Sequence, residues 1–552
     1  MSTCRHAVAA VAAVAAINAK LISIISAAAI GFGVFLSGFV LDEPAPYELY
    51  MTGLIAVSAL FGLRISKPIV PLLVLMITFN IGGMISMTQM SDLASTPLYL
   101  AVSLFLAFTA VFFAAATEAQ PQVFRLIFNA YLAAAVLTSL LGIAGYFHAF
   151  PGATAFTLYD RASGAFQDPN VFGPFLVLPA IYMLHRLVTG SVTKMPLYAM
   201  PLLIVVGGIF FSFSRGAWGL FAAAAIMLMG GLFLQSASGL FRLRVVVMSV
   251  LAVSLLVIAV LIILQIPGVD EFFNNRAQLV QDYDGARLGR FARYGIGFQL
   301  ALEHPLGIGP LVFGTIYGED THDIWLKALM DYGWLGFVSW LVMVCWTLAA
   351  GFRILFRDRT WQPYLLCAYV VFLGHVFLGT IIDTDHWRHF YMLLGIVWGC
   401  IALEYRYQRA AKAGAAPTLI AQERRALKHL HIAGDRQRWI CEAANEDADH
   451  RPDEKQREQS HGHRQHDQIA IARCPGFGLR GRAICGGHVA IRPISRSVAK
   501  GIDRTGGRSP LDPVNSLKRS TPPWPGPPRD QPLVSQSLNL AMTASPLAAQ
   551  NL

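Results

Sequence analysis

The chain has 552 residues, of which 55% are hydrophobic and only 14% are charged, and its mean hydropathy is +0.51. Apolar runs of about 20 residues recur too often for a soluble core, so these values exclude an ordinary soluble enzyme and are typical of a polytopic membrane protein. The formal net charge of +10 is concentrated in short loops and in the C-terminal stretch, which relates it to membrane orientation before nucleic-acid binding.

The first 410 residues predict a membrane domain that follows a short N-terminal segment. Residues 1–20 are rich in Ala and Val and end at Lys20; we interpret them as an uncleaved N-terminal segment, although they could mimic a signal peptide. Residues 21–410 contain about twelve apolar stretches that are long enough to span a bilayer. We therefore expect an all-α transmembrane domain. The stretches are 21–41, 48–63, 68–87, 97–117, 124–148, 169–185, 196–211, 216–235, 245–266, 329–351, 361–381 and 389–405.

Lysine and arginine fall in alternate connections between these stretches, which is the positive-inside pattern. The opposite loops at 42–47 and 88–96 contain neither residue. We therefore expect the basic loops and both termini to be cytoplasmic. The polar connection at 267–322 then lies on the outer face, and a loop of this length is typical of a functional site.

The stretch 411–552 has a different character. It is polar, lacks a sustained apolar period and ends in a Pro-rich run, so we predict a largely disordered cytoplasmic tail. A shifted reading frame would give the same composition and is the alternative. The run His461–His466 could bind a metal, but a solvated polar segment is the interpretation we favour.

Arginines on the outer face work against the orientation signal, so they are expected to meet an anion. Arg161 precedes Asp168-Pro169-Asn170, where the first and last residues suit helix capping and the proline suits a first turn. Arg215 lies in the tight turn Ser212–Trp218, where it either binds an anion or anchors the interface. The other outer-face arginines are Arg276, Arg287, Arg290, Arg293 and Arg388.

The long loop carries two further candidate groups. On a helix Arg287 and Arg290 share a face, and paired guanidiniums suit a phosphate or pyrophosphate; a solvated face paired with Asp282 and Asp284 is the alternative. His322 stands before Asp323 at the lip of a predicted helix. A histidine there can accept a proton from a hydroxyl, or it can be structural.

The order of these motifs resembles the O-antigen ligase and O-antigen polymerase superfamily. It runs from Arg161 to Asn170, through Ser214-Arg215-Gly216 and His304-Pro-Leu-Gly-Ile-Gly309, to His322-Asp323. By motif the resemblance covers about residues 150–340. It implies a glycosyltransferase of the bacterial inner membrane that needs neither cofactor nor metal and takes a glycan from an undecaprenyl-diphosphate carrier on the periplasmic face.

By the same resemblance, His322 is the catalytic residue, and Arg215 with either Arg287 or Arg290 holds the diphosphate. We add Arg161 as a diphosphate contact. Residues expected to support the site are Asp323, Asp168, Asn170 and Arg388. The sequence departs from the family at His322-Asp323, where His-Asn is usual, and in the arginine spacing, which leaves the loop arginine open.

Two hypotheses for the transferase differ in the acceptor that receives the glycan. Lipid A-core would be the acceptor of a ligase, our first hypothesis, and a second lipid-linked glycan that of an O-antigen or exopolysaccharide polymerase. A lipid-linked glycan flippase or secondary transporter is the alternative of another class. The ionisable groups gather on one outer face rather than at the midplane, which favours the transferase. Membrane lipid is an expected partner, and nucleic acid is not.

Overall fold

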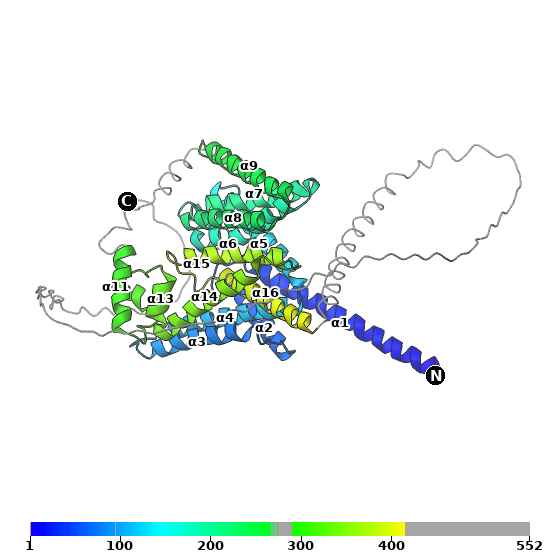
Figure 1. Cartoon of the computed structure of the whole chain (residues 1–552). Coiled ribbons are helices and arrows are strands. Elements are labelled where there is room, and N and C mark those ends of the chain that lie inside the picture. Colours follow the sequence, from blue (N-terminus) through cyan, green and yellow to red (C-terminus); the bar gives the residue numbers. More distant parts are fainter. Residues whose placement is uncertain (1, 94, 266–268, 270–272, 274–289, 414–552) are drawn as a thin grey trace, which may run out of the picture. The chain divides into compact units, whose positions relative to one another are not determined.

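The computed structural model describes residues 2–93, 95–265, 269, 273 and 290–413. Within them the chain is almost entirely helical (Figure 1). The first part comprises α1 (Ser2–Leu36), α2 (Pro46–Leu60), α3 (Val70–Met87), α4 (Thr96–Ala119), α5 (Val123–Tyr146), η1 (Ala153–Phe156), β1 (Thr157–Leu158), β2 (Arg161–Ala162), α6 (Pro169–Thr189) and η2 (Val192–Lys194). The second comprises α7 (Met195–Phe211), α8 (Arg215–Gln235), α9 (Gly239–Ile263), α11 (Arg290–Glu303), α12 (Val312–Tyr317), α13 (Ile324–Asp331), α14 (Gly333–Leu355), α15 (Gln362–Leu378) and α16 (Arg388–Lys412).

Each of the twelve predicted apolar stretches coincides with a helix, from α1 to α9 and from α14 to α16. In the part of the chain that the structure describes, eight helices are long and apolar enough to cross a membrane: α3 to α6, α7 with the η2 turn before it, α8, α9 and α14. The apolar segment Lys20–Leu36 of α1 and helix α15 are shorter. The prediction of a helical domain with several candidate membrane spans is thus confirmed, while the number of twelve spans stays a prediction.

The helices pack in two groups that α15 joins. One contains α3, α4, α14 and α16, which lie side by side in Figure 1; α16 packs on α4, and α14 packs on α3. The other contains α5, α6, α7 and α8. Because α15 contacts α6 and α8 as well as α14 and α16, it touches both groups.

Local sequence explains where the site-bearing helices begin. Asp168 caps α6 by accepting from the Asn170 backbone N–H at 2.8 Å, and Pro169 follows in the first turn, as the sequence predicted. The short hairpin β1–β2 comes before it, pairing Leu158 with Arg161. Its two loop residues, Tyr159 and Asp160, both have positive φ, as in a type I′ turn. The hairpin fixes the position of Arg161.

The predicted N-terminal segment 1–20 is continuous with the first span in one helix, α1. The predicted loop 267–322 contains α11 and α12 and leads into α13. Residues 274–289 of the loop, with Arg276 and Arg287, and the predicted tail from residue 414 onward lie outside the described residues.

Candidate functional site

His322 lies in the sharp turn between α12 and α13. Its φ of 53° is in the left-handed region, which a non-glycine residue rarely adopts. Asp323 caps α13, because its Oδ1 accepts from the Trp325 and Leu326 backbone N–H groups at 2.8 and 3.2 Å. The residue that departs from the family pattern thus has a capping function, and it holds His322 at the mouth of a helix.

Two carboxylates face the His322 ring from opposite sides. Nε2 lies 3.3 Å from Glu319 Oε1, and Nδ1 lies 3.6 Å from Asp383 Oδ2. The Asp383 carboxylate above all raises the pKa of His322, against the opposing effect of burial, and Glu319 adds to the rise. Because Glu319 is 59% exposed and Asp383 only 17%, Asp383 is the fixed partner and Glu319 the exchangeable one.

Arg293 connects the loop helix α11 to this pair. Its guanidinium forms a 2.5 Å ion pair with Glu319 and donates to the Asp320 carbonyl at 3.1 Å. Arg293 and His322 together hold the pKa of Glu319 below its usual value, although burial alone would raise it. Arg290 begins α11 one turn earlier. Of the predicted loop arginines, only Arg293 has a described side chain, and its ion pair brings it to the carboxylate that faces His322.

Behind His322 lies a buried charge network centred on Lys327. Its ammonium is 3.4 Å from Asp320 Oδ2 and 3.5 Å from Asp383 Oδ2. Burial would lower the pKa of Lys327, but the surrounding carboxylates, led by Asp385, hold it well above its usual value. Asp385 in turn accepts from the Tyr99 hydroxyl at 2.6 Å. Lys327 thus contacts the same Asp383 oxygen that faces His322 Nδ1, and it holds that carboxylate beside the histidine.

The second predicted cluster forms around Arg161, which is 6% exposed. Its Nε donates to the Ser212 carbonyl at 2.8 Å, and a terminal nitrogen donates to Asn170 Oδ1 at 2.7 Å. Arg161 thereby ties the start of α6 to the turn before α8. Arg215 begins α8 directly after that turn, behind the capping residue Ser214.

The two clusters meet at the C-terminal end of α15. The Ile324 backbone N–H donates to the Gly379 carbonyl at 2.8 Å, and Asp383 follows in the same connection. On the other side, a Cβ at Gly216 would lie 2.8 Å from Leu378 Cδ1, so the start of α8 lies close to the end of α15. One short segment of chain thus has the Arg215 turn on one side and His322 on the other.

The predicted motif His304–Gly309 anchors the loop helix to the membrane domain. Ile308 donates its backbone N–H to the Met330 carbonyl at 2.8 Å, and Pro305 accepts from Trp334 at 3.1 Å. Gly307 has a φ of 90°, and a Cβ there would lie 2.7 Å from the Met330 carbonyl oxygen. This close backbone packing fixes where α11 meets α13.

Arg388 belongs to a third cluster. Its guanidinium binds the carboxylates of Glu48 and Glu43, the latter at 2.9 Å. These contacts connect the start of α16 to α2 and to the loop before it, which favours a structural function for Arg388.

Sequence reasoning missed Asp383, Glu319 and Lys327. The signal that could have found Asp383 is the run Asp383-Thr384-Asp385-His386, which places three ionisable residues in a connection predicted to lie on the outer face. Glu319 and Lys327 flank His322 by three and five residues, on either side of a turn that the sequence does not predict in detail.

The sequence model of one protein family, described as O-antigen ligase, matches residues 200–341. This segment runs from α7 into α14 and includes the Arg215 turn, the loop and His322. Arg161 and Asp383 lie outside it. No curated protein sequence matches the chain.

Proposed function

We propose that the chain, whose residues 200–341 match the O-antigen ligase family, is a glycosyltransferase. It would move a glycan from an undecaprenyl-diphosphate carrier to a hydroxyl acceptor on the periplasmic face of the bacterial inner membrane. The observation that carries the proposal is His322, held between two carboxylates beside the same end of α15 that the Arg215 turn contacts. A proton acceptor and the turn that bears Arg215 thereby lie at the same end of α15.

The arginines serve the donor. Transfer breaks the bond between the anomeric carbon and the carrier diphosphate, so negative charge develops on the leaving diphosphate. Arg215 and a loop arginine, Arg290 or Arg287, would stabilise that charge. Arg293 would position the loop helix α11 in the site, because its ion pair with Glu319 connects α11 to the histidine.

His322 serves the acceptor. The acceptor oxygen forms its bond to the anomeric carbon by direct displacement, and its proton passes to the imidazole. The exposed Glu319 is the partner that an incoming hydroxyl can displace from Nε2, while Asp383 stays in contact with Nδ1. The imidazolium that results is stabilised by the Asp383 carboxylate.

Arg161 has a supporting function in this scheme. Its hydrogen bonds to Asn170 and the Ser212 carbonyl position the turn that leads to Arg215. A direct diphosphate contact, the original prediction for Arg161, would have to use donors beyond those two bonds.

The test is reconstitution of the purified full chain in lipid nanodiscs with an undecaprenyl-diphosphate-linked oligosaccharide. Lipid A-core and a second carrier-linked oligosaccharide are offered as competing acceptors, with and without a chelator. Transfer to lipid A-core in the presence of chelator is the expected result. Transfer to neither acceptor, with intact donor binding, would contradict the proposal.

A repeat-unit polymerase is the second candidate, because it requires the same diphosphate and hydroxyl chemistry. The glycan profile of a deletion strain separates the two. Loss of long-chain lipopolysaccharide with carrier-linked polymer retained indicates a ligase, whereas single-repeat caps indicate a polymerase.

A further inference from the structure

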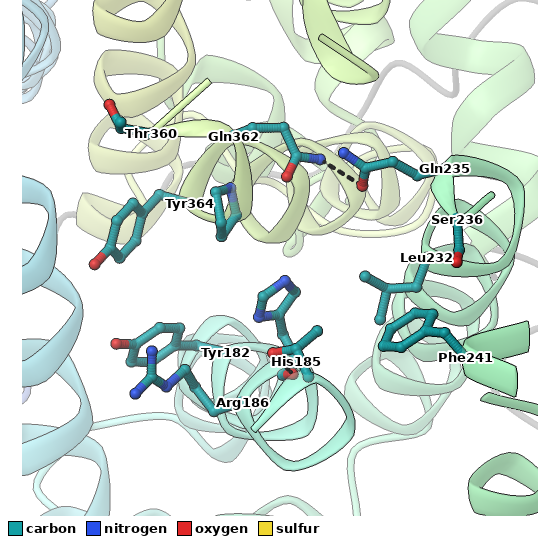
Figure 2. Close-up of a pocket in the computed structure, with 12 residues that line it drawn as sticks. Tyr182, His185, Arg186, Leu232, Gln235, Ser236, Phe241, Thr360, Gln362 and Tyr364 are labelled. Carbon is teal, nitrogen blue, oxygen red and sulfur yellow. Dashed lines mark hydrogen bonds between the residues drawn. The ribbon is translucent and has the colours of Figure 1, made fainter. Parts of the chain in front are cut away.

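A pocket of about 550 Å³ lies at the opposite ends of the helices from His322. It is bounded by the last turns of α6 and α8 and the first turns of α9 and α15 (Figure 2). The basic connections at this end are those that the sequence predicts to be cytoplasmic. The volume is within the range of small-molecule sites and exceeds what a single inorganic phosphate would fill.

His185 projects into this pocket from α6 (Figure 2). The residue is only 6% exposed, and its Nδ1 is buried without a hydrogen-bond partner among the described residues. A buried polar atom left unpaired costs free energy. A ligand that brings a hydrogen-bonding group to the imidazole would recover it.

The pocket favours an anion. None of its twelve lining residues, all in the described part of the chain, is acidic, and Arg186 stands at its edge with one guanidinium nitrogen donating to Tyr198 at 2.8 Å. Arg242 donates to the carbonyl of the lining residue Ser236 at 2.9 Å. The starts of α9 and α15 also contribute lining residues, and helix N-termini carry partial positive charge.

The opposite wall of the pocket is apolar. Leu232 and Phe241 form it, while Gln235 accepts from Gln362 at 2.9 Å and closes the gap between α8 and α15 (Figure 2). A ligand that fits both walls has an anionic polar part and an apolar part. Membrane phospholipids have this combination at the level of the helix ends, and basic pockets between helices on the cytoplasmic side are typical phospholipid headgroup sites.

We propose that this pocket binds the phosphate headgroup of an anionic phospholipid of the cytoplasmic leaflet, with His185 and Arg186 as its donors and the Leu232–Phe241 wall against the start of the acyl chains. The site is separate from the transferase site. Its occupancy stabilises the junction of α6, α8, α9 and α15, because a ligand that binds only the folded state raises its stability.

Native mass spectrometry of the purified full chain tests this with three probes: dioleoylphosphatidylglycerol, dioleoylphosphatidylcholine and glycerol 1-phosphate. Both lipids offer the same phosphate, but the choline cation of phosphatidylcholine would lie beside Arg186, and no described lining residue is a carboxylate. We therefore expect phosphatidylglycerol to bind at least about tenfold more tightly. His185→Phe, which keeps an aromatic ring but removes its nitrogens, and Arg186→Gln should each remove most of this preference. The matched control Arg353→Gln, at another predicted cytoplasmic helix end, should retain it.

Equal binding of the two lipids would overturn the anion assignment. Wild-type preference in both His185→Phe and Arg186→Gln would overturn the location. Glycerol 1-phosphate competing on equal terms would assign the pocket to a soluble phosphate ester and overturn the lipid. Because Arg186 is exposed, its variant tests the site even if His185→Phe fails to fold, and none of these measurements depends on glycan transfer.

Discussion

Asp383→Asn should slow glycan transfer more than Glu319→Gln, although both carboxylates face the His322 ring. Asp383 Oδ2 is 3.6 Å from His322 Nδ1, and Coulomb's law with an effective dielectric constant of about 20 gives roughly 4.6 kcal/mol at that distance. The His322 side chain is 33% exposed, so solvent screening reduces this to about 1 to 2 kcal/mol. If His322 gains its proton in the transition state, kcat falls by about 5- to 30-fold.

The assay is transfer by reconstituted protein as a function of pH. Transfer needs the neutral imidazole, so the rate rises as the pH passes through the raised pKa of His322. Removing the Asp383 charge lowers that pKa, and the acid limb of the profile should move to lower pH. Glu319→Gln is the matched control, since this more exposed carboxylate is displaced by the acceptor. Unchanged kcat and an unchanged acid limb in Asp383→Asn, or a larger effect in Glu319→Gln, would refute the reasoning.

Three further predictions concern the donor site, the orientation and the tail. Arg215→Ala should abolish binding of the lipid-diphosphate donor, and Arg215→Lys should restore little because lysine lacks the forked guanidinium; binding like that of the wild type in Arg215→Ala would remove this residue from the site. A cysteine at Gln278 should react with a membrane-impermeant reagent in intact spheroplasts, and labelling only after lysis would reverse the predicted topology. Truncation after Ala411 should leave transfer intact in the reconstituted assay, whereas its loss at normal abundance would show that the tail is functional.

The helices could be predicted from the sequence because apolar length and charge alternation are local signals. The helix start at Asp168-Pro169-Asn170 was equally local, and the structure confirms it. The contacts of the site were not local. His322 and Asp383 are 61 residues apart, and the two come together only because α14 and α15 return the chain to the same end of the bundle.

Arg388 is a second residue whose binding partner the sequence does not identify. Its predicted position on the outer face suggested an anionic partner, and the structure provides one, but the anion belongs to the protein itself. Glu48 is 340 residues away in sequence, and it comes within reach because α2 and α16 both pack on α4. Charge placement thus indicated that a partner exists without identifying it.

The central claim, that His322 handles the acceptor and not the donor, is tested most directly by His322→Ala in the purified full chain. Binding of the lipid-diphosphate donor should be retained, while turnover falls by about 100- to 10,000-fold, as is typical of a lost acid-base group. His304→Ala, the exposed histidine of the same loop, is the matched control and should turn over like the wild type. Near-normal turnover in His322→Ala, or loss of donor binding along with turnover, would contradict the account.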